Sequence, residues 1–382
     1  MKPMFVVVAS SLLLLAGCGQ ESPESLSQRA EENYREAQYS KTITAYERLL
    51  TVDGESPVTY NNLALAAYQA QDYSYAIKMA EKALALGPDT ETTDLCYEIL
   101  GMVAEKEKDY PRAATYYRKI LGSPNTALRV RVHSRLAKIY AEQSHYDAAL
   151  ALLLNAQEMN PMDAATLYNL GMLCKHEAMN LRQSALDWFR QAERMLPEDS
   201  EKRKDASNQV RRLEAYLTSL KQLPALSGNA ATCANFLKEM QNEMKRKNFK
   251  SAESLARKAV TADPSSYEAA LELARICKKN KRNSEALKAY DTAIALRPNA
   301  TEPRYEAAQI AFDTKQYKAA ADYLRPALVA NPKSRAQADL MGRIHFYQRQ
   351  KVNAKIWYER ALRLTPKADE KYRSWVQQLP EA

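Results

Sequence analysis

The sequence is poor in the residues that sheet-rich enzymes and cofactor-binding loops use. Its 382 residues include nine Gly and six Phe, too few for the glycine-rich turns and aromatic strands typical of a sheet-rich enzyme. The nucleophile motif G-x-S-x-G, the phosphate-binding loop G-x-x-x-x-G-K-[ST] and the dinucleotide motif G-x-G-x-x-G do not occur. The commonest signatures of serine hydrolases and nucleotide-binding enzymes are therefore missing.

Residues that could form a metal or redox site are also few and scattered. There are five Cys without C-x-x-C spacing, so buried free thiols are favoured over a disulfide framework or a zinc site. The four His lie far apart, at positions 133, 145, 176 and 345, and His176-Glu177 lacks a second His four residues later. Adjacent carboxylates such as Glu31-Glu32 fit a solvated helix surface. We predict no catalytic residue, metal or cofactor; an enzyme remains an alternative that would need convergent titratable groups in a pocket.

What the sequence does contain is a repeat of 34 residues. It is clearest from Pro57 to Thr90, which reads PVTYNNLALAAYQAQDYSYAIKMAEKALALGPDT. The period, the small residues at fixed offsets and the closing Pro resemble the tetratricopeptide pattern W-x2-L-G-x2-Y, A-x3-F, P. This resemblance implies an all-α fold in which helical hairpins stack into a solenoid.

Each repeat is expected to form two amphipathic helices. In the clearest one they cover about Val58–Gln69 and Tyr73–Leu86, and Gly87 takes the positive φ that ends the second helix. Small residues occupy the positions where the helices approach closely, since larger ones would push the backbones apart. One hairpin cannot bury its apolar face alone, so neighbouring repeats must stack.

Nine segments follow this pattern, and we predict that they form two arrays. Residues 26–223 hold about five repeats and a capping helix at 199–223, and residues 231–382 hold four repeats and a cap at 369–379. A linker at 224–230 contains Pro224 and Ser227-Gly228-Asn229, which break the helix.

The first residues are predicted to be an export signal. Lys2 precedes an apolar run from Phe5 to Leu15, which is too short to span a membrane, and Leu15-Ala16-Gly17-Cys18 follows. These four residues resemble the lipobox of bacterial lipoproteins, in which the signal (here 1–17) is cleaved and the Cys is acylated. The alternative is an ordinary secretory signal that ends in Cys.

The resemblance to bacterial lipoproteins also implies a location. Several acyl chains on Cys18 anchor a protein stably, and residues 18–25 would form a short lipidated tether. Gly19 in place of Asp favours outer-membrane sorting in a Gram-negative host, with the protein facing the periplasm.

Charge is unequally divided. Residues 1–222 carry 26 Lys and Arg against 29 Asp and Glu, whereas residues 223–382 carry 29 against 17. Basic clusters fall at the expected turns of the second array, and we call them the basic ridge: Lys245, Arg246, Lys247, Lys279, Lys281 and Arg282. Such a ridge could face acidic protein segments, lipid phosphates or an anionic polysaccharide; an exported protein is a poor partner for nucleic acid. A merely soluble basic face is the alternative.

In tetratricopeptide proteins, the first helix of each repeat lines a concave groove that binds partners. The second, fifth, ninth and twelfth positions of these helices face inward, and aromatic and Arg side chains there are the types that anchor partners. The resemblance places these residues in the groove: Glu98, Met102, Glu105, Lys138, Tyr168, Met172, Leu271, Arg275, Lys278, Tyr305, Phe312, Arg343 and Phe346.

The function that these patterns favour is a non-enzymatic, lipid-anchored scaffold of the bacterial cell envelope. It is similar in plan to tetratricopeptide lipoproteins that help assemble pili, secretion pores or outer-membrane complexes, and its expected partners are other envelope proteins or peptide segments. The alternative is a polysaccharide-export accessory protein whose basic second array contacts an anionic glycan. The sequence leaves the oligomeric state open.

Overall fold

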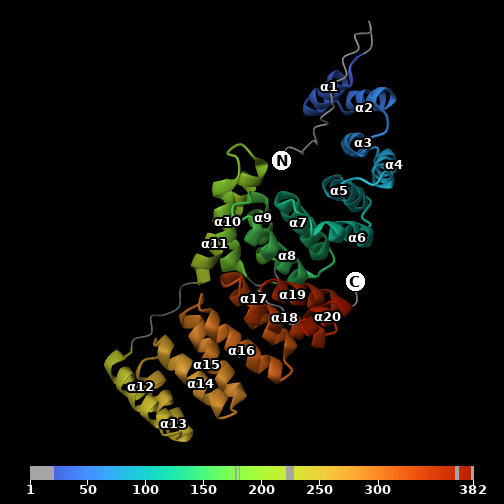
Figure 1. Ribbon diagram of the computed structural model, residues 1–382. Helices are drawn as coiled ribbons and strands as arrows, with labels where there is room; N and C mark the ends of the chain where they lie inside the picture. The colour runs from blue at the N-terminus through green and yellow to red at the C-terminus, as the bar shows by residue number, and fades with distance from the viewer. Residues whose placement is uncertain (1–20, 177–178, 180, 221–227, 366–369, 380–382) are drawn as a thin grey trace. The chain divides into compact units, whose positions relative to one another are not determined.

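The computed structural model describes residues 21–176, 179, 181–220, 228–365 and 370–379. Within these residues there are twenty α-helices and no strand (Figure 1). The helices follow one another as hairpins in a tetratricopeptide-like solenoid, so the predicted fold class is confirmed. The export signal, Cys18 and Gly19 lie outside the described residues. No helix in the described part of the chain is long and apolar enough to cross a membrane.

The nine predicted hairpins are present, with bounds close to those expected. The first five are α1 (Pro23–Arg35) with α2 (Tyr39–Asp53), α3 (Pro57–Gln69) with α4 (Tyr73–Ala85), α5 (Thr90–Lys106) with α6 (Tyr110–Ile120), α7 (Thr126–Glu142) with α8 (Tyr146–Met159), and α9 (Ala164–Lys175) with α10 (Arg182–Met195). The other four are α12 (Ala230–Lys245) with α13 (Phe249–Ala262), α14 (Tyr267–Lys279) with α15 (Asn283–Leu296), α16 (Thr301–Asp313) with α17 (Tyr317–Ala330), and α18 (Arg335–Tyr347) with α19 (Lys351–Arg363). The expected capping helices are α11 (Glu201–Leu220) and α20 (Glu370–Gln378).

The described chain divides into two compact units, and the division falls within the residues of α7. The first ends at Ile139 and the second begins at Tyr140. Within the second unit α8 contacts α19 as well as α9, so the last hairpins of the first predicted array join the second array in one unit. The predicted domain boundary at 224–230 stays a prediction, because residues 221–227 lie outside the described part.

Side-chain caps explain where the helices begin. Ser56 and Asp72 precede α3 and α4, and each accepts a hydrogen bond from the backbone N–H three residues later. Gly87, just after α4, has a φ of +66°, as predicted for a residue that ends the helix.

The turn inside each hairpin has its own backbone signature. In every hairpin whose turn is fully described, one non-glycine residue of this turn has a positive φ, between 58° and 64°; the α9–α10 turn lies partly outside the described residues. These residues are Ala37, Gln71, Lys108, Ser144, Lys247, Lys281, Lys315 and Arg349. The next residue then donates its N–H to a carbonyl five residues back, as from Asp72 to Ala67 at 2.9 Å, so the turn satisfies the carbonyls at the helix end.

Three hairpins bring a glycine of the first helix against an aromatic ring of the second. Gly101, Gly171 and Gly342 face Tyr117, Phe189 and Tyr358. A Cβ added at Gly171 or Gly342 would lie 2.8 or 2.7 Å from a ring carbon. The prediction of small residues at the closest approach of the helices is confirmed at these positions.

The four described cysteines agree with the sequence analysis. Cys96, Cys174, Cys233 and Cys277 are buried and free. Burial raises the pKa of the Cys96 and Cys174 thiols to about 12, so these thiols belong to the core rather than to a reactive site.

Candidate partner-binding surfaces

The last two hairpins and the closing helix α20 carry an aromatic surface. We use this name for Phe312, Tyr317, Phe346, Tyr347 and Trp375. The ring centroids of Phe312, Tyr317 and Tyr347 lie 5.5–5.7 Å from one another, and Phe346 lies 5.9 Å from Tyr347 and 6.0 Å from Trp375. α16 supplies Phe312, α18 supplies Phe346 and Tyr347, and α20 supplies Trp375.

Part of this surface is open to solvent. Phe346 and Tyr347 are 46% and 56% exposed. The exposed Arg343 places its guanidinium 4.6 Å from the centroid of the Phe312 ring, which orients a cationic donor beside the rings. Tyr and Arg are among the residue types enriched at the hot spots of protein interfaces.

A different predicted anchor, Arg275, is already committed to neighbours in the fold. Its guanidinium bonds Glu272 at 2.7 Å, Glu306 at 3.4 Å and Glu302. Burial lowers the pKa of Arg275, but these carboxylates outweigh it and raise the pKa. Lys278 also pairs with Glu306, at 3.4 Å. These charges are compensated within the unit.

Four of the predicted groove side chains are buried, contrary to the expectation that they would offer surface. Glu98, Met102, Leu271 and Phe312 are at most 9% exposed. Phe312 is covered by the Arg343 guanidinium and by the rings described above. Glu98 forms a two-pronged ion pair with Arg131, with N–O distances of 2.8 and 3.0 Å.

The remaining first-array positions are more open. Glu105 bonds Arg135 at 3.1 Å and the exposed Lys138 at 3.4 Å, and Met172 is 40% exposed. The Tyr168 hydroxyl donates to Asp205 of the capping helix α11 at 2.6 Å. Burial, and then this hydrogen bond, raise the pKa of Tyr168 to about 12.

In the second array Tyr305, like Tyr168 in the first, is partly buried. Partner binding by the open and partly buried positions stays a prediction.

All six side chains of the basic ridge are exposed. Arg246 pairs with Glu243 at 2.9 Å, Arg282 pairs with Glu253 at 2.7 Å, and the Lys279 ammonium lies 5.6 Å from the Phe249 ring centroid. The turns of the next two hairpins add Lys315 and Arg349, which the sequence analysis did not single out because each stands outside a basic cluster.

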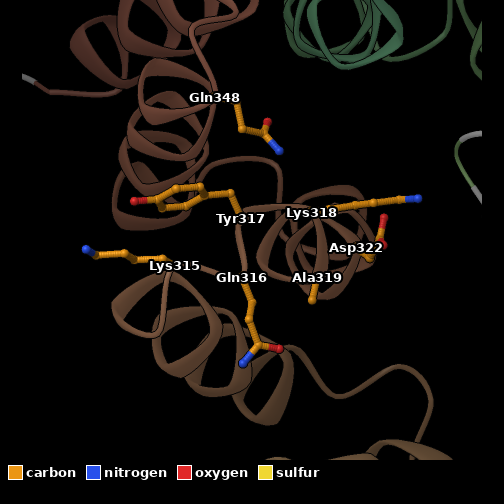
Figure 2. Close-up of a pocket in the computed structure, with 7 residues that line it drawn as sticks. All are labelled: Lys315, Gln316, Tyr317, Lys318, Ala319, Asp322 and Gln348. Carbon is orange, nitrogen blue, oxygen red and sulfur yellow. The ribbon is translucent and has the colours of Figure 1, made fainter.

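One open pocket adjoins these turns. It has a volume of about 530 Å³ and is lined by Lys315, Gln316, Tyr317, Lys318, Ala319, Asp322 and Gln348. Figure 2 shows Lys315 and Lys318 extending to opposite sides of the α16–α17 turn, with the Gln348 amide approaching from the next hairpin. A smaller pocket of about 390 Å³ lies between α1 and α2.

One group among the described residues has the atoms for a metal site. The Cys277 thiol and the carboxylates of Glu253 and Glu285 lie within 4.8 Å of one another. Arg257 and Arg282 each bond both carboxylates. Two guanidinium groups thus compensate the two carboxylates, and we place no metal there.

A buried ionic cluster joins α8 to α17 and α18 within the second unit. Both carboxylate oxygens of Asp147 accept from Arg325, at 2.6 and 2.8 Å, and the Nε2 atom of His345 lies 3.2 Å from the same carboxylate. Burial alone would raise the pKa of Asp147, but Arg325 and then His345 outweigh it and hold the pKa well below its usual range. Because the partners fully surround this carboxylate, it stabilises the contact rather than serving as a reactive group.

The repeat assignment agrees with comparisons to known proteins. Two family models, each described as tetratricopeptide repeat, match the chain, one at residues 134–200 and 237–303 and the other at 278–344. The chain contains tetratricopeptide repeats. Proteins built from this repeat (TPR) are typically non-catalytic scaffolds that bind other proteins. No curated protein matches the sequence.

Several solved TPR structures are similar to parts of the chain. MamA from Desulfovibrio magneticus RS-1 is 18% identical with a TM-score of 0.36, and the match covers 39% of this chain and 84% of MamA. The APC/C hetero-tetramer Cut9–Hcn1 is 14% identical with a TM-score of 0.36, and the match covers 94% of this chain and 82% of the other. Similarity at these values bears on neither the partner nor the pathway.

Proposed function

We propose that the chain is a non-enzymatic, lipid-anchored scaffold of the bacterial cell envelope that binds partner segments on the first helices of its TPRs. The TPR hairpins supply the scaffold, and the lipobox-like sequence ending at Cys18 supplies the anchor. Gly19 in place of Asp supports an outer-membrane position facing the periplasm in a Gram-negative host. Such a scaffold would hold other envelope proteins during assembly of a pilus, a secretion system or an outer-membrane complex.

The observation that carries the binding part of this proposal is the aromatic surface. Phe346 and Tyr347 are among the few large apolar side chains of the described residues that are more than a third exposed. They stand beside each other on α18 and next to Arg343. Burying two such rings under a partner would give a hot spot of the usual kind, in which each truncation costs about 2 kcal/mol or more.

The test is the double variant Phe346→Ala, Tyr347→Ala. A partner is recovered from envelope extracts with the mature protein, identified, purified and titrated against both forms. We expect the double variant to bind at least about thirtyfold more weakly, as the loss of one or two hot-spot residues implies. The matched control is Met162→Ala, Tyr216→Ala, since both of these side chains are also exposed. Equal affinity of the aromatic variant and the wild type would exclude this surface as the binding site.

The anchor has a separate test. Cells expressing the chain are labelled with radioactive palmitate, and their membranes are fractionated. We expect label in the wild type and none in Cys18→Ala, which should also keep its signal peptide, whereas Gln20→Ala should behave as the wild type. A wild-type protein without label would show that the N-terminus is an ordinary secretory signal.

A second candidate function is that of a polysaccharide-export accessory protein that contacts an anionic glycan through the second array. It is supported by the exposure of all six basic-ridge side chains. Exposed charges are screened over about 8 Å at physiological ionic strength, so glycan binding that persists at high salt would argue against this role.

A further inference from the structure

Four consecutive hairpins of the second unit place a cation at the same backbone position. Lys247, Lys281, Lys315 and Arg349 are the positive-φ residues of their turns, at φ of 60–61° and spaced 34 residues apart. We call these four the turn ladder. Because their backbones have the same conformation, their side chains leave equivalent points of successive hairpins along one edge.

The fold does not require a cation at this position. The equivalent turns of the first three hairpins use Ala37, Gln71 and Lys108, so only one of these three carries a cation. The turn of the fourth hairpin, which lies in the second unit, uses Ser144. A positive φ favours Gly, Asn or Asp over a long side chain. The ladder residues therefore do not serve the turn geometry.

The ladder charges are also not used inside the protein. All four side chains are exposed, and none forms an ion pair with a described residue. Other cations of the second unit do have internal partners: Arg282 pairs with Glu253, and Arg325 pairs with Asp147. Four unpaired charges in a row leave a positive edge that attracts an anionic partner.

We propose that the turn ladder binds an extended acidic polypeptide segment with its carboxylates about three residues apart. Neighbouring packed helices lie about 8–10 Å apart, and α16, which precedes the Lys315 turn, contacts α18, which precedes the Arg349 turn. Taking the same spacing for every step of the repeat, we infer that successive residues of the turn ladder stand roughly 10 Å apart. An extended chain advances about 3.3 Å per residue. Every third side chain of such a segment therefore lies opposite one residue of the turn ladder. The inference rests on the proposed function as a protein-binding scaffold, but it uses a surface other than the aromatic one.

The pocket beside Lys315 and Gln348 favours a polypeptide as the partner of the turn ladder. Gln316 follows Lys315 and Gln348 precedes Arg349, and both line this pocket (Figure 2). A primary amide both donates and accepts hydrogen bonds, which matches the N–H and C=O groups of an extended backbone. The carboxylates of the bound segment would pair with the ladder cations. The Gln316 and Gln348 amides would hydrogen-bond the main chain of the segment.

The experiment compares three labelled probes by fluorescence anisotropy at low salt, using the full mature chain. The spaced peptide is (Glu-Ser-Gly)4, the clustered peptide has four Glu followed by (Ser-Gly)4, and the third probe is an oligogalacturonate of equal charge. We expect the spaced peptide to bind most tightly and its binding to disappear at about 0.5 M salt, because exposed charges are then screened within a few ångströms.

The ladder is removed by Lys247→Asn, Lys281→Asn, Lys315→Asn and Arg349→Asn in one protein. Asn tolerates a positive φ well, so the turns keep their shape. We expect the spaced peptide to bind about 10- to 30-fold more weakly, as the loss of four exposed charge pairs implies. The matched control changes the net charge equally, at four exposed positions outside the turns that carry the ladder: Lys238→Gln, Lys288→Gln, Lys333→Gln and Arg335→Gln.

Each result decides between supporting and overturning the inference. Preference for the spaced peptide, lost in the ladder variant and kept in the control, supports it. Equal binding of the spaced and clustered peptides, an equal loss in the control variant, or no peptide binding would overturn it. Binding of oligogalacturonate in preference to both peptides would overturn the polypeptide assignment and favour the glycan function. Capture of the partner through Phe346 and Tyr347 is measured separately, so failure at the ladder leaves that test intact.

Discussion

At the residue scale, the helix pairs are held close by positions where a side chain has almost no room. Gly342 lies against the Tyr358 ring, and Gly101 and Gly171 lie against Tyr117 and Phe189. These glycines stand where other repeats carry Ala, as at Ala64 and Ala274, which are fully buried. The sequence predicted small residues at this approach because their offset in the repeat is constant.

The substitution Gly342→Ala tests this packing. Its new Cβ would lie 2.7 Å from a carbon of the Tyr358 ring, so the ring or the helices must move. We expect the free energy of unfolding to fall by about 1–3 kcal/mol, as is typical of overpacked cores. Urea denaturation measures this.

The control for that substitution is Gly122→Ala. A Cβ there meets nothing within 4 Å, so its effect should stay within about 0.5 kcal/mol. A Gly342→Ala protein as stable as the wild type would mean that the α18–α19 pair is looser than the structure shows.

The solvent exposure of the groove side chains is harder to predict from the sequence than the helix on which each one lies. The sequence correctly places Leu271 on α14 and Phe312 on α16, yet both side chains are buried. Phe312 is covered by Arg343 and Tyr347 from the following hairpin. The position of a residue within the repeat predicts which face of the helix it occupies. It does not predict which side chains of the next repeat cover that face.

At the scale of the element, most helix limits could be read from the sequence. The predicted limits of α3 and α4 agree with the structure to within one residue, because small residues, caps and the closing Gly or Pro recur at fixed offsets. The sequence indicates the role of the turn residues less clearly. No cluster of adjacent basic residues marks Lys315 or Arg349 in the sequence, because each stands alone in its turn. Their relation is visible only when equivalent positions of successive hairpins are compared.

At the scale of the whole molecule, the contact between α8 and the last hairpins is what the sequence could not supply. Residues 147 to 156 of α8 are all buried, far more than one face of a helix. Arg360, fully buried on α19, bonds Asn155 of α8, and Arg363 pairs with Glu158 at 3.1 Å. Burial, and then the neighbouring Arg363, lower the pKa of Arg360 to about 10. Contacts across some 200 residues leave no periodic trace in the sequence, so the repeat pattern does not indicate them.

The Asp147 cluster gives this contact a testable pH dependence. In the folded state the carboxyl is charged at a pKa well below its usual range, held by Arg325 and His345, with Asp322 also bonded to Arg325. The unfolded chain therefore binds a proton first, at a pKa of about 4. The stability that this carboxylate contributes is present above that pH and is lost as the pH falls below it.

We expect Asp147→Asn to lower the free energy of unfolding near neutral pH by about 1–3 kcal/mol, because it removes the buried carboxylate that Arg325 and His345 share and leaves Arg325 with Asp322 alone. The variant should also lose less stability than the wild type between pH 5 and 3. Urea titrations across this range measure both effects, with the exposed Asp187→Asn as the control. Parallel acid profiles for the wild type and Asp147→Asn would contradict the role assigned to this carboxylate.

The single-file stacking of α1 to α6 has a mechanical consequence. The most extensive contacts of these hairpins are with the helices next to them in the row, so we expect tension applied ahead of Pro23 to unfold the hairpins one at a time. Each 34-residue hairpin that unfolds would add roughly 110–120 Å of extended chain. The first unit could therefore lengthen in steps under tension. In the second unit α8 and α19 contact each other. This unit would resist the same tension until the contact between α8 and α19 breaks.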